Sequence, residues 1–314
     1  MSLLWDQHAC LPLHCAASVE PVTRFAHPGS TFVSINAGYS PHTFADTTRL
    51  LHHYRGAITA HPRLTLAETA RQLPGTPPGT VTIAFDLEDA APLDADLDNL
   101  PRLATLGVRA LAPTYNHANL AGGGCLDTDN PGLTRWGRDL IARMNATGVV
   151  PDGSHGSART GLDMCEISTR PVVYSHSCLR SVWEHPRNIT DDQARACAET
   201  GGVVGITGVG IFLGPNTPTL EAMTRHLEYA VELIGIDHVG VSTDHSFDAA
   251  DFLTEIARNP HLFDESYTRW GPLTWMPPET FLTLGDHLAR RGWAAADIEA
   301  VLSANFLRVA RATW

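Results

Sequence analysis

The sequence predicts a parallel α/β protein, and two observations support that expectation. Short apolar runs with the length of buried strands alternate, about eight times, with longer stretches of helical period. No convincing internal repeat, low-complexity segment or linker interrupts this alternation, so a single domain over residues 1–314 is the simplest account. Alternation of this kind builds either an open, doubly wound sheet or a closed barrel.

The expected strands are short and rich in β-branched and aromatic residues. A glycine-rich run at 202–210 does not follow the first strand, as a dinucleotide-binding fingerprint must, so we interpret it as a strand with a tight loop. The expected strands are 3–10, 31–36, 81–88, 110–114, 149–154, 172–175, 203–207 and 238–242.

The expected helices lie between these strands and after the last one. Thr190 and Gln193 form the pattern of a capping box, and Gly148 and Gly235 stand where helices should end. The stretch 246–278 has no clear period, and we expect it to be irregular and to cover part of a site as a lid. The expected helices are 43–60, 65–73, 96–106, 134–147, 157–167, 191–200, 218–234, 278–291 and 295–311.

Charge and composition exclude several classes of protein. There are 34 acidic and 22 basic residues, with no basic stripe, which argues against a nucleic-acid partner. All of the basic residues are Arg, so neither a P-loop NTPase nor a Schiff-base lysine enzyme fits. No apolar run is long enough to span a membrane, and the first residues lack the pattern of a signal peptide. We therefore expect a cytoplasmic protein without a membrane partner.

Potential metal ligands stand at the carboxyl ends of five expected strands. Such ends meet at one rim of a barrel, where active sites are built. Taken singly, each residue is an ordinary cap or loop residue. Taken together, imidazole, carboxylate and thiol groups favour a zinc site. The residues are His8 and Cys10, Asp86 and Glu88, His155, His176 and Asp244.

Several segments together resemble the membrane (renal) dipeptidase family, the M19 metallopeptidases of the amidohydrolase superfamily. Residues 6–12 read Asp-Gln-His-Ala-Cys-Leu-Pro, where the family has Asp-Gly-His-Asn-Asp-Leu-Pro. Residues 152–155 (Asp-Gly-Ser-His) and 171–177 (Pro-Val-Val-Tyr-Ser-His-Ser) resemble the family's two histidine segments. Residues 185–192 contain its Arg-Asn-x-x-Asp-Asp run, and residues 305–308 its Asn-x-x-Arg.

This resemblance implies a (β/α)8 TIM barrel with a binuclear zinc centre, and it implies a role for individual residues. His8 and the residue at position 10 would hold one zinc ion, Glu88 would bridge both ions, and His155 and His176 would hold the second. Arg187 would bind the substrate's terminal carboxylate through its planar fork. Asp244 would carry a proton from the attacking water to the leaving amine. The family is often homodimeric, so the resemblance also allows a homodimer.

Three positions depart from the family. Cys10 stands where the family has a ligand Asp, which leaves open a Cys-ligated binuclear site, a site with one zinc ion, or a loss of activity. Tyr115 stands where some members place a histidine that polarises the substrate, and its hydroxyl or the nearby His117 would take that role. His245 follows Asp244 where the family usually has Phe, and it either assists the site or is a loop residue.

These expectations converge on a zinc-dependent dipeptidase that cleaves small dipeptides, including those with a D-residue at the C-terminal position. Two alternatives stay open. The first is an amidohydrolase for another small amide or a lactone, such as an N-acyl amino acid. The second is a metal-depleted relative that binds a peptide-like ligand without cleaving it.

Overall fold

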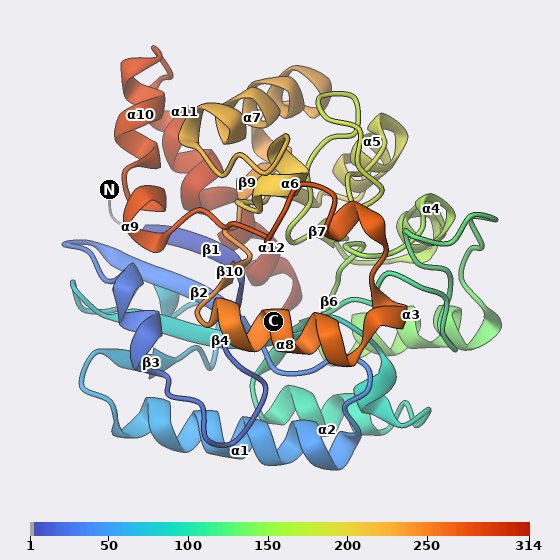
Figure 1. Cartoon of the computed structure of the whole chain (residues 1–314). Helices are drawn as coiled ribbons and strands as arrows, with labels where there is room; N and C mark the ends of the chain where they lie inside the picture. The colour runs from blue at the N-terminus through green and yellow to red at the C-terminus, as the bar shows by residue number, and fades with distance from the viewer. Residues whose placement is uncertain (1–2) are drawn as a thin grey trace.

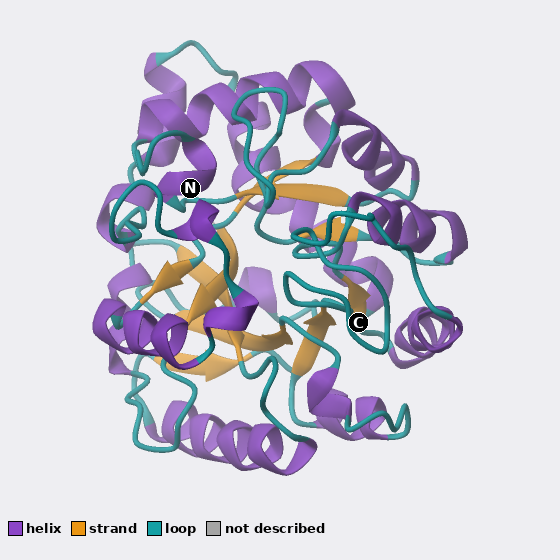
Figure 2. Cartoon of the chain, turned by 45° about the vertical axis from the view of Figure 1, so that its right-hand side comes forward, coloured by secondary structure: helices purple, strands orange, loops and turns teal. Residues whose placement is uncertain are grey.

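The computed structural model describes residues 3–314, and its strands form a ring surrounded by helices (Figures 1 and 2). Met1 and Ser2, part of the N-terminal stretch considered for a signal peptide, lie outside the described residues. Every ladder between the strands is parallel. The strands are β1 (Leu3–Cys10), β2 (Ser30–Asn36), β3 (Leu64–Leu66), β4 (Val81–Leu87), β5 (Val108–Leu111), β6 (Val150–Pro151), β7 (Val173–Tyr174), β8 (Val203–Ile206), β9 (Val239–Val241) and β10 (His245–Ser246).

The order of the strands closes the ring. One sheet runs β10-β1-β2-β4-β5-β6 and another runs β7-β8-β9. A parallel bridge between Asp152 and Val173 joins β6 to β7. On the other side β10, which follows β9 directly, pairs with the end of β1, and the Asp244 N–H donates to the carbonyl of His8 at 2.9 Å. The barrel implied by the family resemblance is therefore confirmed.

The helices cover the outside of this ring, and side chains cap many of their N-termini. Thr190 and Gln193 form the predicted capping box at α5, and Gly148 ends α3 in the left-handed conformation with φ 78°. In the described residues, no helix is long and apolar enough to cross a membrane. The helices are α1 (Phe44–Ala60), α2 (Asn99–Thr105), α3 (Arg135–Thr147), α4 (Ala158–Ile167), α5 (Asp191–Glu199), α6 (Gly210–Leu213), α7 (Leu220–Ile234), α8 (Ala249–Arg258), α9 (Pro278–Phe281), α10 (Leu284–Arg290), α11 (Ala295–Glu299) and α12 (Asn305–Thr313).

Three stretches differ from the sequence prediction. The expected helix at 65–73 is wrong: this stretch begins as β3, which pairs with β4, and its later residues reach only a 3-10 turn, Leu73–Gly75. The stretch 246–278 is not irregular throughout, because it contains the 10-residue helix α8. The expected helix at 295–311 is interrupted by a π-helical turn, Ala300–Ala304, between α11 and α12.

The amino-terminal end of the barrel is filled by an apolar plug. Trp5 and Phe32 point inward from β1 and β2 and belong to one buried cluster with Phe306 of α12. A Cβ on Gly240 would lie 2.4 Å from the Phe306 ring, so the glycine allows this ring to pack against β9. Since this end is closed by side chains, a ligand can enter the barrel only from the carboxyl ends of the strands.

Candidate active site

The structure brings the predicted ligands together at the carboxyl rim of the barrel. Two groups of side chains each offer ligand atoms that lie within 4.8 Å of one another. Asp244, which the sequence analysis assigned to proton transfer, lies within the first group. The first group is His8, Cys10, Glu88 and Asp244, and the second is Glu88, His155 and His176.

A β-bulge on β1 aims His8 and Cys10 into the barrel. The register between β1 and β2 shifts between Asp6 and Ala9. Before the shift, Trp5 points inward, and after it His8 and Cys10 do so. An extra residue in one strand turns the following side chains to the other face. The sequence predicted that these two residues share a face, but not that a bulge directs that face inward.

The first group is built around His8. Its Nε2 lies 2.5 Å from Glu88 Oε1, 3.4 Å from Cys10 Sγ and 3.6 Å from Asp244 Oδ1. Burial acts to lower the pKa of His8, but the surrounding acidic groups, Asp86 first, outweigh it and raise the pKa well above its usual value. Burial also raises the pKa of the Cys10 thiol. This group therefore gathers acidic side chains around one imidazole.

The second group is built around two neutral imidazoles. His155 Nε2 lies 3.0 Å from His176 Nε2, which in turn lies 3.9 Å from Glu88 Oε1. Burial, with added repulsion from Arg187 and His8, holds the pKa of both histidines well below its usual value. Both imidazoles are therefore uncharged at neutral pH, which is the form that binds metal ions.

Polar side chains behind the histidines fix which ring nitrogen faces the site. The Nδ1 of His155 lies 2.8 Å from Asn116 Oδ1. The Nδ1 of His176 lies 2.6 Å from Ser175 Oγ, whose proton is donated to Asp152, so His176 is the donor in this contact. In each ring the proton is thus on Nδ1, and Nε2 is the unprotonated nitrogen.

His8 has the same kind of support from Asp86. Its Nδ1 lies 3.0 Å from Asp86 Oδ1, and Ser34 donates to the other carboxylate oxygen at 2.5 Å. Asp86, one of the potential ligands in the sequence, therefore supports His8 and belongs to neither ligand group. The positioning of the rings by Asn116 and Ser175 was not predicted. Ser175 stands directly before a predicted ligand, so its place in the sequence was a signal, whereas Asn116 reaches His155 from a distant loop.

Asp244 belongs to the first group and also lines the pocket above it. Burial raises its pKa to about 7, with further contributions from Glu88 that raise it and from His8 that lower it. Its backbone has φ 50°, and His155 and Asn116 are also in the left-handed region, at 65° and 60°. Non-glycine residues in this conformation are uncommon and gather at functional sites.

Arg187 is buried beside the second group, with only 2% of its surface exposed. Its Nη2 lies 3.1 Å from His155 Nε2 and donates to the carbonyl of His176 at 3.4 Å. The guanidinium lies 5.1 Å from the centre of the Phe212 ring. Among the described residues nothing accepts a hydrogen bond from its Nε, so this buried cation retains a free donor.

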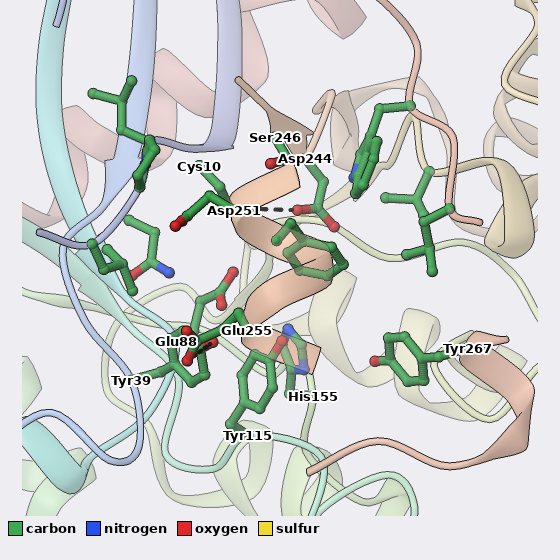
Figure 3. A pocket seen from close by; sticks show the side chains of 18 of the residues that line it. Cys10, Tyr39, Glu88, Tyr115, His155, Asp244, Ser246, Asp251, Glu255 and Tyr267 are labelled. Carbon is green, nitrogen blue, oxygen red and sulfur yellow. Dashed lines mark hydrogen bonds between the residues drawn. The ribbon is translucent and has the colours of Figure 1, made fainter. Parts of the chain in front are cut away.

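A pocket opens above these groups, and Figure 3 shows it from close by. It contains about 740 Å³ of empty space, part of it open to solvent. Tyr115 lines the pocket and stacks on His155, with the ring centres 4.2 Å apart. Seven of the lining residues come from the segment 246–278: Ser246, Asp251, Phe252, Glu255, Tyr267, Leu273 and Trp275.

Two histidines considered in the sequence analysis lie outside the pocket lining. His117 is partly exposed, and its Nδ1 lies 3.2 Å from Asp127 Oδ1. His245 is buried behind Asp244, and Arg24 Nη1 lies 3.2 Å from its Nε2. Tyr115, not His117, is therefore the residue of that loop that faces the pocket.

Comparison of the sequence with known protein families matches this chain to one family. The model of the membrane dipeptidase family (peptidase family M19) matches residues 26–313. A dipeptidase of Clonostachys rogersoniana, verJ, is 35% identical over 174 residues, which are 53% of this chain and 44% of that protein. An uncharacterized protein of Klebsiella pneumoniae, encoded 5' of pqqA, is 34% identical over 193 residues, 57% of this chain and 70% of that protein.

Solved structures share the fold over the whole chain. An amidohydrolase from Pseudomonas aeruginosa has a TM-score of 0.87 and 23% identity, covering 100% of this chain and 97% of its own. A metallopeptidase from Rhodobacter sphaeroides, bound to a phosphinate mimic of L-Ala-D-Ala, has a TM-score of 0.75 and 20% identity, covering 100% and 99%. The family model covers most of the sequence although it begins after His8 and Cys10, and this chain belongs to the membrane dipeptidase family, the M19 metallopeptidases.

Proposed function

We propose that this protein is a zinc-dependent dipeptidase that hydrolyses small dipeptides with a free C-terminal carboxylate. The observation that carries the proposal is the pair of ligand groups that share Glu88 at the base of a pocket, with the buried Arg187 beside them. The chain matches only about half the length of several curated dipeptidases, so family membership does not by itself assign their substrates to this protein.

The donor atoms of the second group fit a metal ion. His155 and His176 both carry their proton on Nδ1, so two nitrogen lone pairs face each other at 3.0 Å. Lone pairs in this arrangement repel each other, and a bound cation turns that repulsion into coordination. Neutral imidazoles and a carboxylate are a common ligand set for zinc. We therefore assign His155, His176 and Glu88 to one zinc ion.

The first group fits a second zinc ion with an unusual ligand. His8 Nε2, Glu88 Oε1 and Cys10 Sγ lie close together, and a thiolate is a good zinc ligand. Burial raises the pKa of the Cys10 thiol, so the protein alone favours the protonated form, and only a bound cation would make the thiolate stable. We propose that Cys10 replaces a carboxylate ligand here and that Glu88 bridges both ions.

The remaining residues supply binding and proton transfer. Bound metal ions would lower the pKa of a water molecule and polarise the scissile carbonyl. Asp244, whose pKa burial raises, can accept a proton from the attacking water and pass it to the leaving amine. Arg187 would hold the terminal carboxylate. Burial raises the pKa of Tyr115 well above its usual value, so its hydroxyl stays protonated and can donate to the substrate.

The test is amino-acid release from a panel of L-Xaa-L-Xaa and L-Xaa-D-Xaa dipeptides by zinc-loaded protein whose metal content is measured in parallel. We expect two zinc ions per chain and release from some members of the panel. No release with two ions bound would reject the dipeptidase and turn attention to N-acyl amino acids and lactones. No release and no bound zinc would favour a relative that binds its ligand without cleaving it.

A further inference from the structure

The charged side chains of the pocket separate into two ends, and this inference from their arrangement rests on the proposed function. Apart from the two ligand groups, the charged residues that line the pocket are Arg187, Asp251 and Glu255. Asp251 and Glu255 both belong to α8, one helical turn apart. Arg187 lies in a different part of the chain, in the loop between β7 and α5. A ligand in this pocket therefore meets one cation and two carboxylates.

A row of stacked rings separates the two ends. Arg187 Nη2 lies 3.1 Å from His155 Nε2, the His155 and Tyr115 rings are 4.2 Å apart, and the Tyr115 and Tyr39 rings are 4.5 Å apart. The Tyr39 hydroxyl then donates to Glu255 Oε1 at 3.0 Å. Figure 3 shows Tyr39, Tyr115 and His155 in sequence along one side of the pocket, with Glu255 beside Tyr39.

The two carboxylates of α8 have no cationic partner. No Arg or His of residues 3–314 forms an ion pair with either one. Glu255 Oε1 accepts from Tyr39 and from Asn259 at 2.7 Å, both neutral donors. Asp251 stands in the first turn of α8, where a negative charge stabilises a helix. Helix stability alone is therefore a sufficient reason for an acidic residue at this position. It does not explain Glu255, because the last turn of a helix disfavours negative charge.

An independent observation indicates which way a dipeptide lies in the pocket. The Nε of Arg187 is a buried donor without an acceptor, so the anionic end of a ligand belongs there. A dipeptide whose carboxylate is held at Arg187 places its peptide bond, and then its N-terminal residue, farther from Arg187 and toward the ligand groups. The side chain of the N-terminal residue is then a part of the substrate that can extend toward α8.

We propose that Asp251 and Glu255 select dipeptides whose N-terminal residue carries a cationic side chain, that is, arginine or lysine. Phe252, Leu11 and Leu13 also line the pocket and offer apolar contacts to the methylene groups of such a side chain. Its charged end pairs with the two carboxylates of α8. The pocket then matches its substrate at three points: the carboxylate, the scissile bond and the side-chain charge.

The test compares L-Arg-Ala with L-citrulline-Ala, which has nearly the same shape without the charge, using both L- and D-Ala at the second position. For zinc-loaded wild-type protein we expect kcat/KM to favour the arginine dipeptide by at least about 10-fold, the size of one favourable charge contact in a partly buried site. Asp251→Asn and Glu255→Gln should each reduce this ratio several-fold. The double variant should bring the ratio close to one.

The ratio is measured within each variant, so a loss of folded protein cancels. Glu265→Gln is the matched control, because it removes one exposed carboxylate of the same segment that does not line the pocket, and it should keep the wild-type ratio. Equal hydrolysis of both dipeptides by the wild type, or an unchanged ratio in the double variant, would overturn this inference and leave the dipeptidase intact. No hydrolysis of any dipeptide would overturn both.

Discussion

Arg187 offers the sharpest test of how the substrate is held. We expect Arg187→Ala to reduce kcat/KM for dipeptides mainly through KM, because the proposed role of the residue is to bind the terminal carboxylate and not to take part in bond cleavage. The guanidinium is buried, and removing one member of a buried, hydrogen-bonded charge pair costs about 2–5 kcal/mol. That cost corresponds to a fall in kcat/KM of about 30-fold to several thousand-fold.

The assay compares each dipeptide with its C-terminal amide, which lacks the negative charge. The wild type should prefer the free acid strongly, and Arg187→Ala should lose that preference. Arg187→Lys should recover only part of it, because lysine keeps the charge but not the planar fork.

Arg225→Ala is the matched control for this test. Arg225 is an exposed arginine of α7 that does not line the pocket. This variant should retain the preference for the free acid. If Arg187→Ala still discriminated between acid and amide as the wild type does, the assignment of the carboxylate to Arg187 would be wrong.

Three further predictions concern the metal ligands, the proton carrier and a buried histidine. Cys10→Ala should lower the bound zinc from two ions per chain to one, whereas Cys10→Asp should keep two; unchanged zinc in Cys10→Ala would remove Cys10 from the ligand set. Asp244→Asn should lower kcat by at least about 100-fold with the zinc content intact, and a kcat within a few-fold of wild type would exclude it as the proton carrier. Burial lowers the pKa of His226 to about 4, whereas the pKa of a histidine in an unfolded chain is near 6.5. The folded protein with neutral His226 is therefore fully stable above pH 6.5, and the free energy of unfolding decreases as the pH falls toward 4. From pH 6.5 to pH 4.5 the free energy of unfolding, measured by denaturant titration at each pH, should fall by about 2 kcal/mol less in His226→Asn than in the wild type, and an equal fall in the two proteins would contradict this.

The sequence predicted the base of the pocket well, for a physical reason. A residue that directly follows a buried parallel strand must emerge at the carboxyl rim, whatever the loops around it do. Glu88, His155, His176 and Asp244 each follow such a strand, and the structure places their side chains in the two ligand groups. The strands themselves were predictable because apolar runs of this length have few alternatives to a buried strand.

Other parts of the fold depend on contacts that the local sequence does not contain. The stretch 65–73 has a helical pattern, yet its first residues belong to the strand β3, which pairs with β4. Pairing with a neighbouring strand here outweighs the local propensity for helix. The bulge in β1 depends on its register with β2, which a single strand cannot reveal. In the same way, Asn116 lies in a loop, with φ 60°, and contacts His155 from there. Its role could therefore be recognised only in the folded structure.

The same reasoning explains why substrate selection was less accessible to the sequence than catalysis. Chemistry at the rim uses residues that strand ends bring together, and these are recognisable one strand at a time. The proposed selection depends on Tyr39, Asp251 and Glu255, which lie on a loop and on a helix that look like ordinary surface elements in the sequence alone. Only when α8 lies against the pocket, with Tyr39 donating to Glu255, do two acidic residues of an amphipathic helix become a place for a cation. In members of this family with other segments at this place, we therefore expect the ligand groups to stay while the preferred N-terminal residue changes.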